Sequence, residues 1–227
     1  MTGRKQNSVG DRVLMALVFL FLYAPIIILI VFSFNAGTSS SVWKGFSLKW
    51  YESLLSNRLI MNSVYTTLMV SLLSTIAAAI AGTFAAIGLY AMSRRRRAIV
   101  NSVNNIPMMN ADIVTGVSLS LLFIFIGTKM LGIRNSLTFW TLLIAHVTFN
   151  LPYVILNVMP KLKQTDSSLR DAAMDLGCTP LQAFFKVTLH EIAPGIVSGA
   201  IMAFTMSLDD FVISYLVSGL DFVTLPV

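Results

Sequence analysis

Three aspartates, Asp112, Asp209 and Asp210, lie within long apolar segments of this sequence. A carboxylate at the centre of a lipid bilayer costs about 3 kcal/mol or more, so it is expected to have a partner or a task. One such task is to replace water around a positively charged group, which favours a cation over an oxyanion as the bound species. The alternative is that the acids only pair with polar groups of neighbouring helices, such as the asparagines of 101–110.

Helical periodicity separates the two adjacent aspartates of the last apolar segment. At about 100° per residue, Ser207, Asp210 and Ser214 share one polar face, which Phe211 borders. Asp209 points about 100° away from that face. We therefore expect Asp210 to line a path and Asp209 to face a partner or to act as a second ligand. If the helix is unwound at this point, both carboxylates could face the path.

Transmembrane helices are the elements that would position these side chains. The 227 residues are 56% hydrophobic and only 11% charged, with a mean hydropathy of +0.79. This composition predicts an all-α, polytopic membrane helix bundle. The single cysteine excludes an intrachain disulfide, and no Cys/His cluster has the spacing of a zinc site. The net charge of +6 gives little support to nucleic-acid binding.

Five segments are long and apolar enough to cross a membrane, each needing roughly 20 residues. They lie at about 13–34, 61–92, 106–127, 138–158 and 192–217. With a cytoplasmic N-terminus, most of the 16 lysines and arginines fall on the cytoplasmic side, as the positive-inside rule requires. We expect one membrane domain over residues 1–227, with a cytoplasmic N-terminus.

Three polar features interrupt these segments. Pro107 lacks a backbone donor and predicts a kink or break where the third segment begins. His146 and Asn150 are one turn apart and could face a common cavity, although a hydrogen bond between packed helices is the favoured interpretation. The stretch "FSLKWYESLL" (46–55) predicts a short amphipathic helix with Trp50, which could be an interfacial anchor or a lid.

The segment between the fourth and fifth spans predicts two short helices at an angle. Asp166 is a suitable N-cap, Gly177 a suitable stop, and Thr179 followed by proline a suitable second start. The second helix would carry an apolar stripe that fits a groove on a partner protein. The alternative is a connector that packs on its own bundle. The stripe includes Leu181, Phe184 and Phe185.

The stretch "DAAMDLG" followed by "FFKVTLHEIAPGIVSG" resembles the EAA loop of permease subunits of binding-protein-dependent ABC importers. Asp171, Ala172, Ala173 and Gly177 fall at the spacing of that family. Asp171 stands where glutamate is usual and keeps the charge, while His190 stands where a proline is common. The resemblance implies a cytoplasmic loop at about 160–191 that couples the permease to an ATPase.

Further stretches, among them "YAPIIILIVFSFN" (23–35), "HVTFNLPYVI" (146–155) and "SLDDFVISYLVSG" (207–219), are similar to the second permease subunit of spermidine/putrescine importers. The resemblance implies the transmembrane domain of a type I ABC importer in a bacterial inner membrane. Its expected partners are membrane lipid, a second homologous permease, an external polyamine-binding protein and two ATPase subunits, which bind ATP and magnesium. The permease itself would hold no cofactor and would not be an enzyme. Because the family has six helices, we expect an incomplete chain that lacks the sixth.

A polyamine cargo would give the candidate residues a common purpose. Spermidine and putrescine are linear cations, so Asp112, Asp209 and Asp210 would hold ammonium groups, and the aromatic rings of Trp50 and Phe211 would cover methylenes. Two alternatives remain open. One is an ABC permease for another cargo such as iron, thiamine or sulfate, and the other is a proton-coupled secondary transporter.

Overall fold

The computed structural model describes residues 9–39, 42–130, 132–133, 136–219 and 222–227. The regular secondary structure of the described residues is helical, apart from one antiparallel bridge between Asn35 and Phe46. It divides into two compact units, Met1–Met61 and Asn62–Val227, which are treated separately below. The assignment of the whole chain to one membrane domain stays a prediction.

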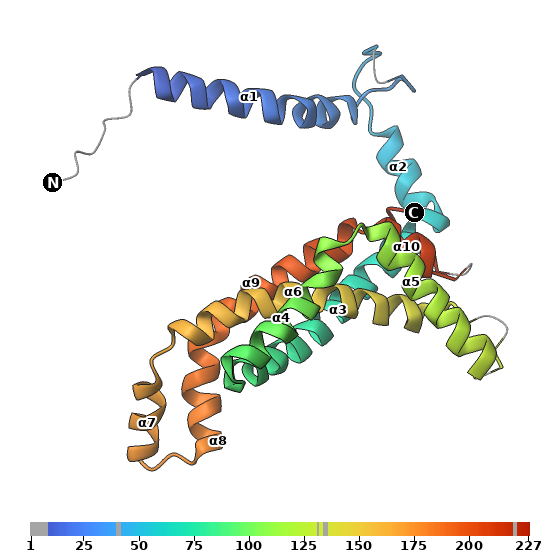
Figure 1. The fold of residues 1–227 in the computed structure, drawn as a ribbon. Coiled ribbons are helices and arrows are strands. Elements are labelled where there is room, and N and C mark those ends of the chain that lie inside the picture. Colours follow the sequence, from blue (N-terminus) through green and yellow to red (C-terminus); the bar gives the residue numbers. More distant parts are fainter. Residues whose placement is uncertain (1–8, 40–41, 131, 134–135, 220–221) are drawn as a thin grey trace. The chain divides into compact units, whose positions relative to one another are not determined.

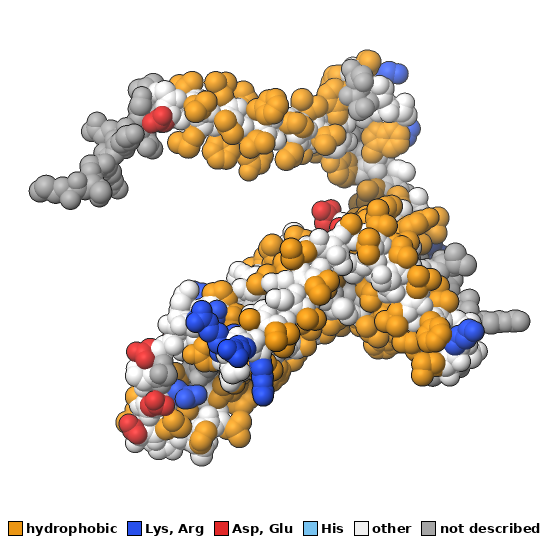
Figure 2. Space-filling model, in the orientation of Figure 1, with side chains coloured by type: hydrophobic (Ala, Val, Ile, Leu, Met, Phe, Trp, Pro, Cys, Tyr) orange, Lys and Arg blue, Asp and Glu red, His pale blue; other side chains and the backbone are white. Residues whose placement is uncertain are grey.

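Unit 1 contains the helices α1 (Val9–Phe32) and α2 (Lys49–Ser56) and the loop between them. Apolar side chains are exposed all along α1, as expected of a helix that lies in lipid, and Figure 2 shows hydrophobic side chains along the face of α1 that is in view. The buried side chain of Asn35 organises the loop, because its amide nitrogen donates to two backbone carbonyls and its oxygen accepts from two backbone amides. Trp50 donates its indole N–H to the Asn35 carbonyl at 3.0 Å.

Unit 2 starts within the long helix α3 and holds the later described helices. Its elements are α3 (Arg58–Ala91), α4 (Arg94–Met109), α5 (Asp112–Ile124), the π-helical η1 (Phe125–Met130), α6 (Phe139–Gln164), α7 (Ser167–Asp175), α8 (Pro180–Ala183), the π-helical η2 (Phe184–Thr188), α9 (Leu189–Asp209) and α10 (Val212–Val217). The helices α6 and α9 lie side by side, and α5 packs on α10 (Figure 1).

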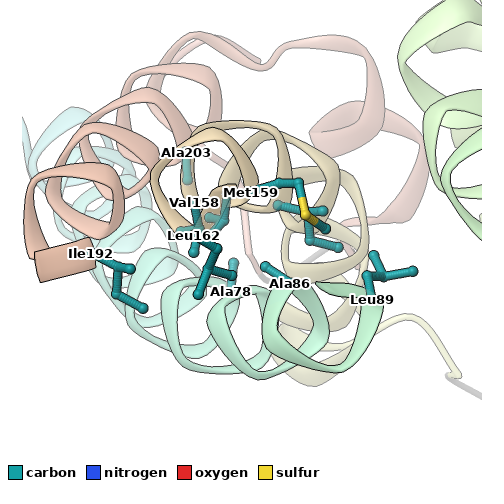
Figure 3. Close-up of a cluster of buried hydrophobic side chains, with 10 residues drawn as sticks. Ala78, Ala86, Leu89, Val158, Met159, Leu162, Ile192 and Ala203 are labelled. Atoms are coloured by element: carbon teal, nitrogen blue, oxygen red, sulfur yellow. The ribbon is translucent and has the colours of Figure 1, made fainter. Parts of the chain in front are cut away.

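Small residues allow α3 to approach α6 and α9 closely. A Cβ on Gly82 of α3 would lie 2.7 Å from a methyl carbon of Val154 of α6, so α3 and α6 touch at this point. Close approach through small residues is the usual way to pack helices where lipid supplies no hydrophobic drive. The core that results is drawn in Figure 3, where the labelled side chains are Ala78, Ala86 and Leu89 of α3, Val158, Met159 and Leu162 of α6, and Ile192 and Ala203 of α9.

Five helices of the described chain are long and apolar enough to cross a membrane, which confirms the predicted number of spans. The fourth span ends at Gln164 rather than 158, and the fifth begins at Pro180 rather than 192. Two further bounds differ from the sequence prediction because the helix is broken. The third candidate span begins at Asp112 rather than near 106, because the backbone is extended at Asn110 and Ala111. The fifth ends at Asp209 rather than 217, because the helix is interrupted at Asp210. Both differences are breaks in the helical backbone that polar residues flank.

The predicted start and stop residues of the loop between the fourth and fifth spans are confirmed. Asp166 accepts a hydrogen bond from the Ser168 amide, and Gly177 ends α7 with a φ of 91°. Such a positive φ suits glycine because it has no Cβ. The amides of Gly177 and Cys178 donate back to Met174 and Ala173, the paired bonds of a Schellman motif.

The prediction of a separate second short helix in that loop is wrong. Thr179 caps α8 in a capping box with Gln182, as its sequence position suggests. The helix then continues through η2 into α9 without an interruption, so residues from Pro180 to Asp209 form one long helical segment. Within the stretch from Ala183 to Leu189 no glycine or proline stops the helix. The helices α7 and α8 lie side by side and form a hairpin with η2, which we call the 167–188 hairpin (Figure 1).

Candidate functional site

The two adjacent aspartates lie where α9 gives way to α10. The helix α9 ends at Asp209, and Asp210 is extended, with φ of −72° and ψ of 112°. The short helix α10 then begins at Val212. The continuous helix expected through residue 217 is therefore absent, and the unwound alternative is the one that the structure shows.

Asp210 makes this break by capping α10. Its Oδ2 accepts a hydrogen bond from the Ser214 amide at 2.7 Å, and its Oδ1 accepts one from the Ile213 amide at 3.3 Å. The first amides of a helix have no partner within the helix, and a carboxylate satisfies them while opposing the positive end of the helix dipole. The side chain of Asp210 is only 7% exposed. Asp210 is thus bound to its own chain, whereas the sequence suggested that it lines a path.

A histidine from α6 reaches the same cap. His146 is buried, and its Nδ1 lies 2.9 Å from the carbonyl oxygen of Leu142. Its Nε2 lies 3.4 Å from the hydroxyl of Ser214 and 3.7 Å from Oδ2 of Asp210. The break is therefore held from a second helix, through a contact between packed helices, the use of His146 that the sequence favoured over a common cavity.

Hydroxyl and amide groups continue this polar region along α9. The hydroxyl of Ser207 lies 3.2 Å from that of Ser74 on α3, and Asn150 of α6 donates to Ser74 at 3.4 Å. All three side chains are buried. The contact of Asn150 with α3 is of the helix-packing kind that the sequence suggested. Ser207 and Ser214, which were expected to share a path with Asp210, thus lie between helices.

Asp209 has a different environment from its neighbour. Its side chain is exposed, and helical spacing puts it on the same face of α9 as Met202 and Thr205. That face bears a groove of about 750 Å³ that runs from His190 to Thr205. Phe211, also exposed, stacks on Tyr215 with the ring centres 5.8 Å apart. Asp209 is therefore the carboxylate of the pair that a molecule outside this bundle can reach.

The third aspartate lies beside a second break. Asp112 is exposed in the first turn of α5, directly after the extended residues Asn110 and Ala111. A break is thus present, but it falls at Asn110 and Ala111, whereas Pro107, from which it was predicted, lies inside α4. A cavity of about 220 Å³ lies at this break and is lined by polar and apolar groups. Its polar lining residues are Asn110, Thr115, Ser118 and Thr148.

The two breaks lie close together because α5 crosses α10 just beyond them. A Cβ on Gly116 would meet Leu216 at 2.8 Å and the Cα of Ile213 at 3.5 Å. Asp112 precedes Gly116 by four residues, and Asp210 precedes Ile213 by three. Each aspartate is therefore three or four residues from the same helix crossing.

The remaining residue of the predicted path, Trp50, belongs to unit 1. There it lines a cavity of about 400 Å³ together with Phe32 and Ser33. Its indole nitrogen is committed to the backbone of the loop, and Lys49 lies over its ring at 5.9 Å. A shared path of Trp50 with the aspartates stays a prediction.

The residues expected to couple to an ATPase lie on the 167–188 hairpin. Asp171 is exposed and has the guanidinium of Arg170 at 3.8 Å. Leu181 is 70% exposed and Phe185 57% exposed, whereas Phe184 is half-buried; Phe184 and Phe185 both line an apolar cavity of about 220 Å³ against α3. The expected apolar stripe is therefore divided between an outer surface and the bundle itself. Ala172 and Ala173 lie one turn before Gly177 on α7.

Charge also stabilises the start of this hairpin. The backbone amide and the hydroxyl of Ser168 donate to Asp166, and these bonds lower the pKa of its carboxyl below the usual value. The carboxylate at this position keeps α7 capped at neutral pH.

Comparison with known proteins matches residues 78–225 to the family of binding-protein-dependent transport system inner membrane components. The putrescine transport system permease protein PotI of Escherichia coli K12 is 42% identical over 94% of this chain and 76% of its own length. The spermidine/putrescine transport system permease protein PotC of Haemophilus influenzae is 40% identical over 93% of this chain and 80% of its own length.

The fold also has a match among solved structures. A chain of a bacterial ABC transporter involved in the import of the acidic polysaccharide alginate superposes with a TM-score of 0.71 at 16% identity, covering 92% of this chain and 77% of that one. At this identity the likeness concerns the fold alone. The sequence matches and the shared fold establish that the chain belongs to the family of binding-protein-dependent transport system inner membrane components, the multi-pass permeases of ABC importers.

Proposed function

We propose that this chain is the permease subunit through which an ATP-driven importer moves polyamines into a bacterial cell. The cargo is inferred from two relatives, at 42% and 40% identity, which are named as permeases for putrescine and for spermidine and putrescine. Exposed carboxylates at the helix breaks support it, because a linear polyamine loses water around each ammonium as it enters a membrane and needs negative groups in exchange.

Asp209 and Asp112 are the proposed amine ligands. Both are exposed, both adjoin a break, and each break lies within four residues of the crossing of α5 with α10. Asp210, whose oxygens accept from the amides of α10, supports the site from within the bundle. The exposed ring of Phe211 next to Asp209 could cover methylene groups of the cargo.

The importer would consist of this chain, a second homologous permease, two ATPase subunits and an external polyamine-binding protein. The 167–188 hairpin would contact an ATPase, with Leu181 as an exposed apolar side chain for its groove. The break lies about 30 Å from the start of α9, which is the thickness of a membrane. The hairpin and the amine site would thus lie at opposite membrane faces, with the N-terminus and the hairpin in the cytoplasm. ATP binding would move the hairpin, and α9 would transmit that motion to the site.

Uptake by the assembled importer in proteoliposomes tests the proposal. We expect ATP-dependent uptake of labelled putrescine or spermidine that unlabelled polyamines compete away and that iron, thiamine or sulfate leave unchanged. Asp209→Asn and Asp112→Asn should each raise the KM about tenfold, the effect of losing one charged hydrogen bond. Glu52→Gln, which removes an exposed acid from α2, is the matched control and should keep the KM of the parent.

Two results would contradict the proposal. Normal polyamine uptake by an assembled importer that carries Asp209→Asn and Asp112→Asn together would exclude these residues as ligands. Uptake without ATP by this chain alone would indicate a proton-coupled secondary transporter instead of an ATP-driven importer.

A further inference from the structure

His146 is a buried titratable side chain that the proposed transport path does not use. It is 2% exposed and is the eighth residue of the apolar span Phe139–Gln164, where a polar ring without a function is costly. Its neighbours within hydrogen-bonding range come from two places in the chain, its own helix at Leu142 and the start of α10 at Ser214. The ring therefore connects α6 with the break between α9 and α10.

The two ring nitrogens have distinct tasks. Nδ1 faces the carbonyl oxygen of Leu142, which can only accept, so Nδ1 carries the proton of the neutral ring. Nε2 then has a free lone pair, and the Ser214 hydroxyl can donate to it. A ring that gains a second proton would instead donate Nε2–H to Asp210, whose Oδ2 is 3.7 Å away. In either protonation state the Nε2 end of the ring holds the start of α10.

The cap of α10 depends on these same groups. Oδ2 of Asp210 accepts from the backbone amide of Ser214, while Nε2 of His146 lies beside the hydroxyl of Ser214 and the same Oδ2. A helix of six residues has too few internal hydrogen bonds to stay formed alone. The place at which the chain leaves the helix after Asp209 is therefore determined by contacts that α6 helps to make.

We propose that His146 is a positioning residue for cargo binding, which holds Ser214 and Asp210 through Nε2 and thereby places the exposed Asp209. The proposal rests on the proposed function. It assigns to His146 no contact with cargo, and its effect reaches the amine only through the geometry of the break.

Two substitutions separate the two ends of the ring. His146→Gln places an amide group near the position of Nε2 and keeps the contact with Ser214, while it gives up the bond to Leu142. His146→Asn places its amide nitrogen near the position of Nδ1 and keeps the bond to Leu142, while it cannot reach Ser214. In proteoliposomes of the full importer we expect the KM for polyamine to stay within about threefold for His146→Gln and to rise about tenfold for His146→Asn, with kcat and assembly unchanged.

The opposite order, a parent-like His146→Asn and an impaired His146→Gln, would overturn the proposal, because the bond within α6 would then be the one that matters. A parent-like KM for both variants would overturn the proposal as well, since any side chain that fills the space of the His146 ring would then suffice for cargo binding.

A spectroscopic measurement that needs no cargo tests the geometry separately. The sole cysteine is Cys178, so Cys178→Ser with Tyr215→Cys allows a single spin label on the exposed face of α10. We expect the same line shape in the parent and in His146→Gln, and a more mobile label in His146→Asn. Equal line shapes in all three would overturn the proposal even if both variants impair uptake. If the parent importer fails to move polyamines, the proposed function fails, and the line shapes still decide whether His146 holds the break.

Discussion

The two ends of the long segment from Pro180 to Asp209 are held in place by different means. At the hairpin end, Asp166, Gly177 and Thr179 bond to backbone groups two or three residues away, and all three residues are exposed. At the break, Asp210 and Ser207 are buried and meet residues of α6 and α3 that lie 64 or more positions away in the sequence. The hairpin can therefore change its contacts without unfolding, whereas the break depends on the packed bundle.

The largest expected effect comes from removing the cap at the break. Asp210→Ala deletes the acceptor of the backbone amides of Ile213 and Ser214 and leaves His146 without its acidic neighbour. Loss of a helix cap together with a buried charged hydrogen bond should lower the free energy of unfolding by about 3 kcal/mol. Chemical denaturation in detergent micelles, followed by circular dichroism, measures the change.

Asp209→Ala is the control for that substitution, because Asp209 directly precedes Asp210 and its side chain is exposed. A surface change of this kind should alter the free energy of unfolding by about 0.5 kcal/mol or less. Equal losses for the two variants would contradict the distinction between the buried and the exposed aspartate.

A somewhat smaller effect is expected where α5 crosses α10. Gly116→Val would place new methyl groups against Leu216, which already lies 2.8 Å from the position of a Cβ. Overpacking of this kind should cost about 2 kcal/mol and separate the two breaks. Thermal unfolding of the purified chain measures the loss, and uptake by the importer should fall with it.

Gly88→Ala provides the matched control for Gly116→Val. Gly88 lies in α3 with no atom within 4 Å of its would-be Cβ, so alanine should be neutral or should stabilise the helix. If Gly116→Val were as stable as the parent, the close contact between α5 and α10 would not be what holds the two breaks together.

The difference between the two ends also explains what the sequence could reveal. Asp166, Gly177 and Thr179 act on nearby backbone, so residue type and spacing were enough to predict their places. The end of α9 was missed, because an apolar stretch with suitable periodicity continues to residue 217 and nothing local identifies Asp210 as a cap. Its partner His146 is 64 positions away, and only the fold brings the two together. The one local signal was the cost of placing adjacent carboxylates in an apolar segment.

The hairpin should lose less stability than the break when a cap is removed. Thr179→Ala deletes the hydroxyl that accepts from the Gln182 amide and leaves half of the capping box. We expect a loss of about 1 kcal/mol confined to this hairpin. Hydrogen exchange of the α8 amides should become faster while exchange in α6 stays as in the parent. Thr179→Ser keeps the hydroxyl and should restore slow exchange; failure to do so would mean that the cap is not the cause.

The smallest effect is a pH dependence of the first turn of α7. In the folded hairpin the pKa of Asp166 is lowered by its bonds to Ser168. The stabilisation that this carboxylate gives is therefore complete above the usual aspartate pKa of about 4 and is lost as the pH falls through the lower folded value. Hydrogen exchange of the α7 amides, corrected for the intrinsic pH dependence of exchange, should show weaker protection at the acid end of this range. Asp166→Asn keeps an oxygen that can accept from the Ser168 amide but cannot titrate, so its protection should not change over the same range. A pH dependence that persists in Asp166→Asn would assign the effect to another group, and the hairpin would then not be held by the local cap that distinguishes it from the break.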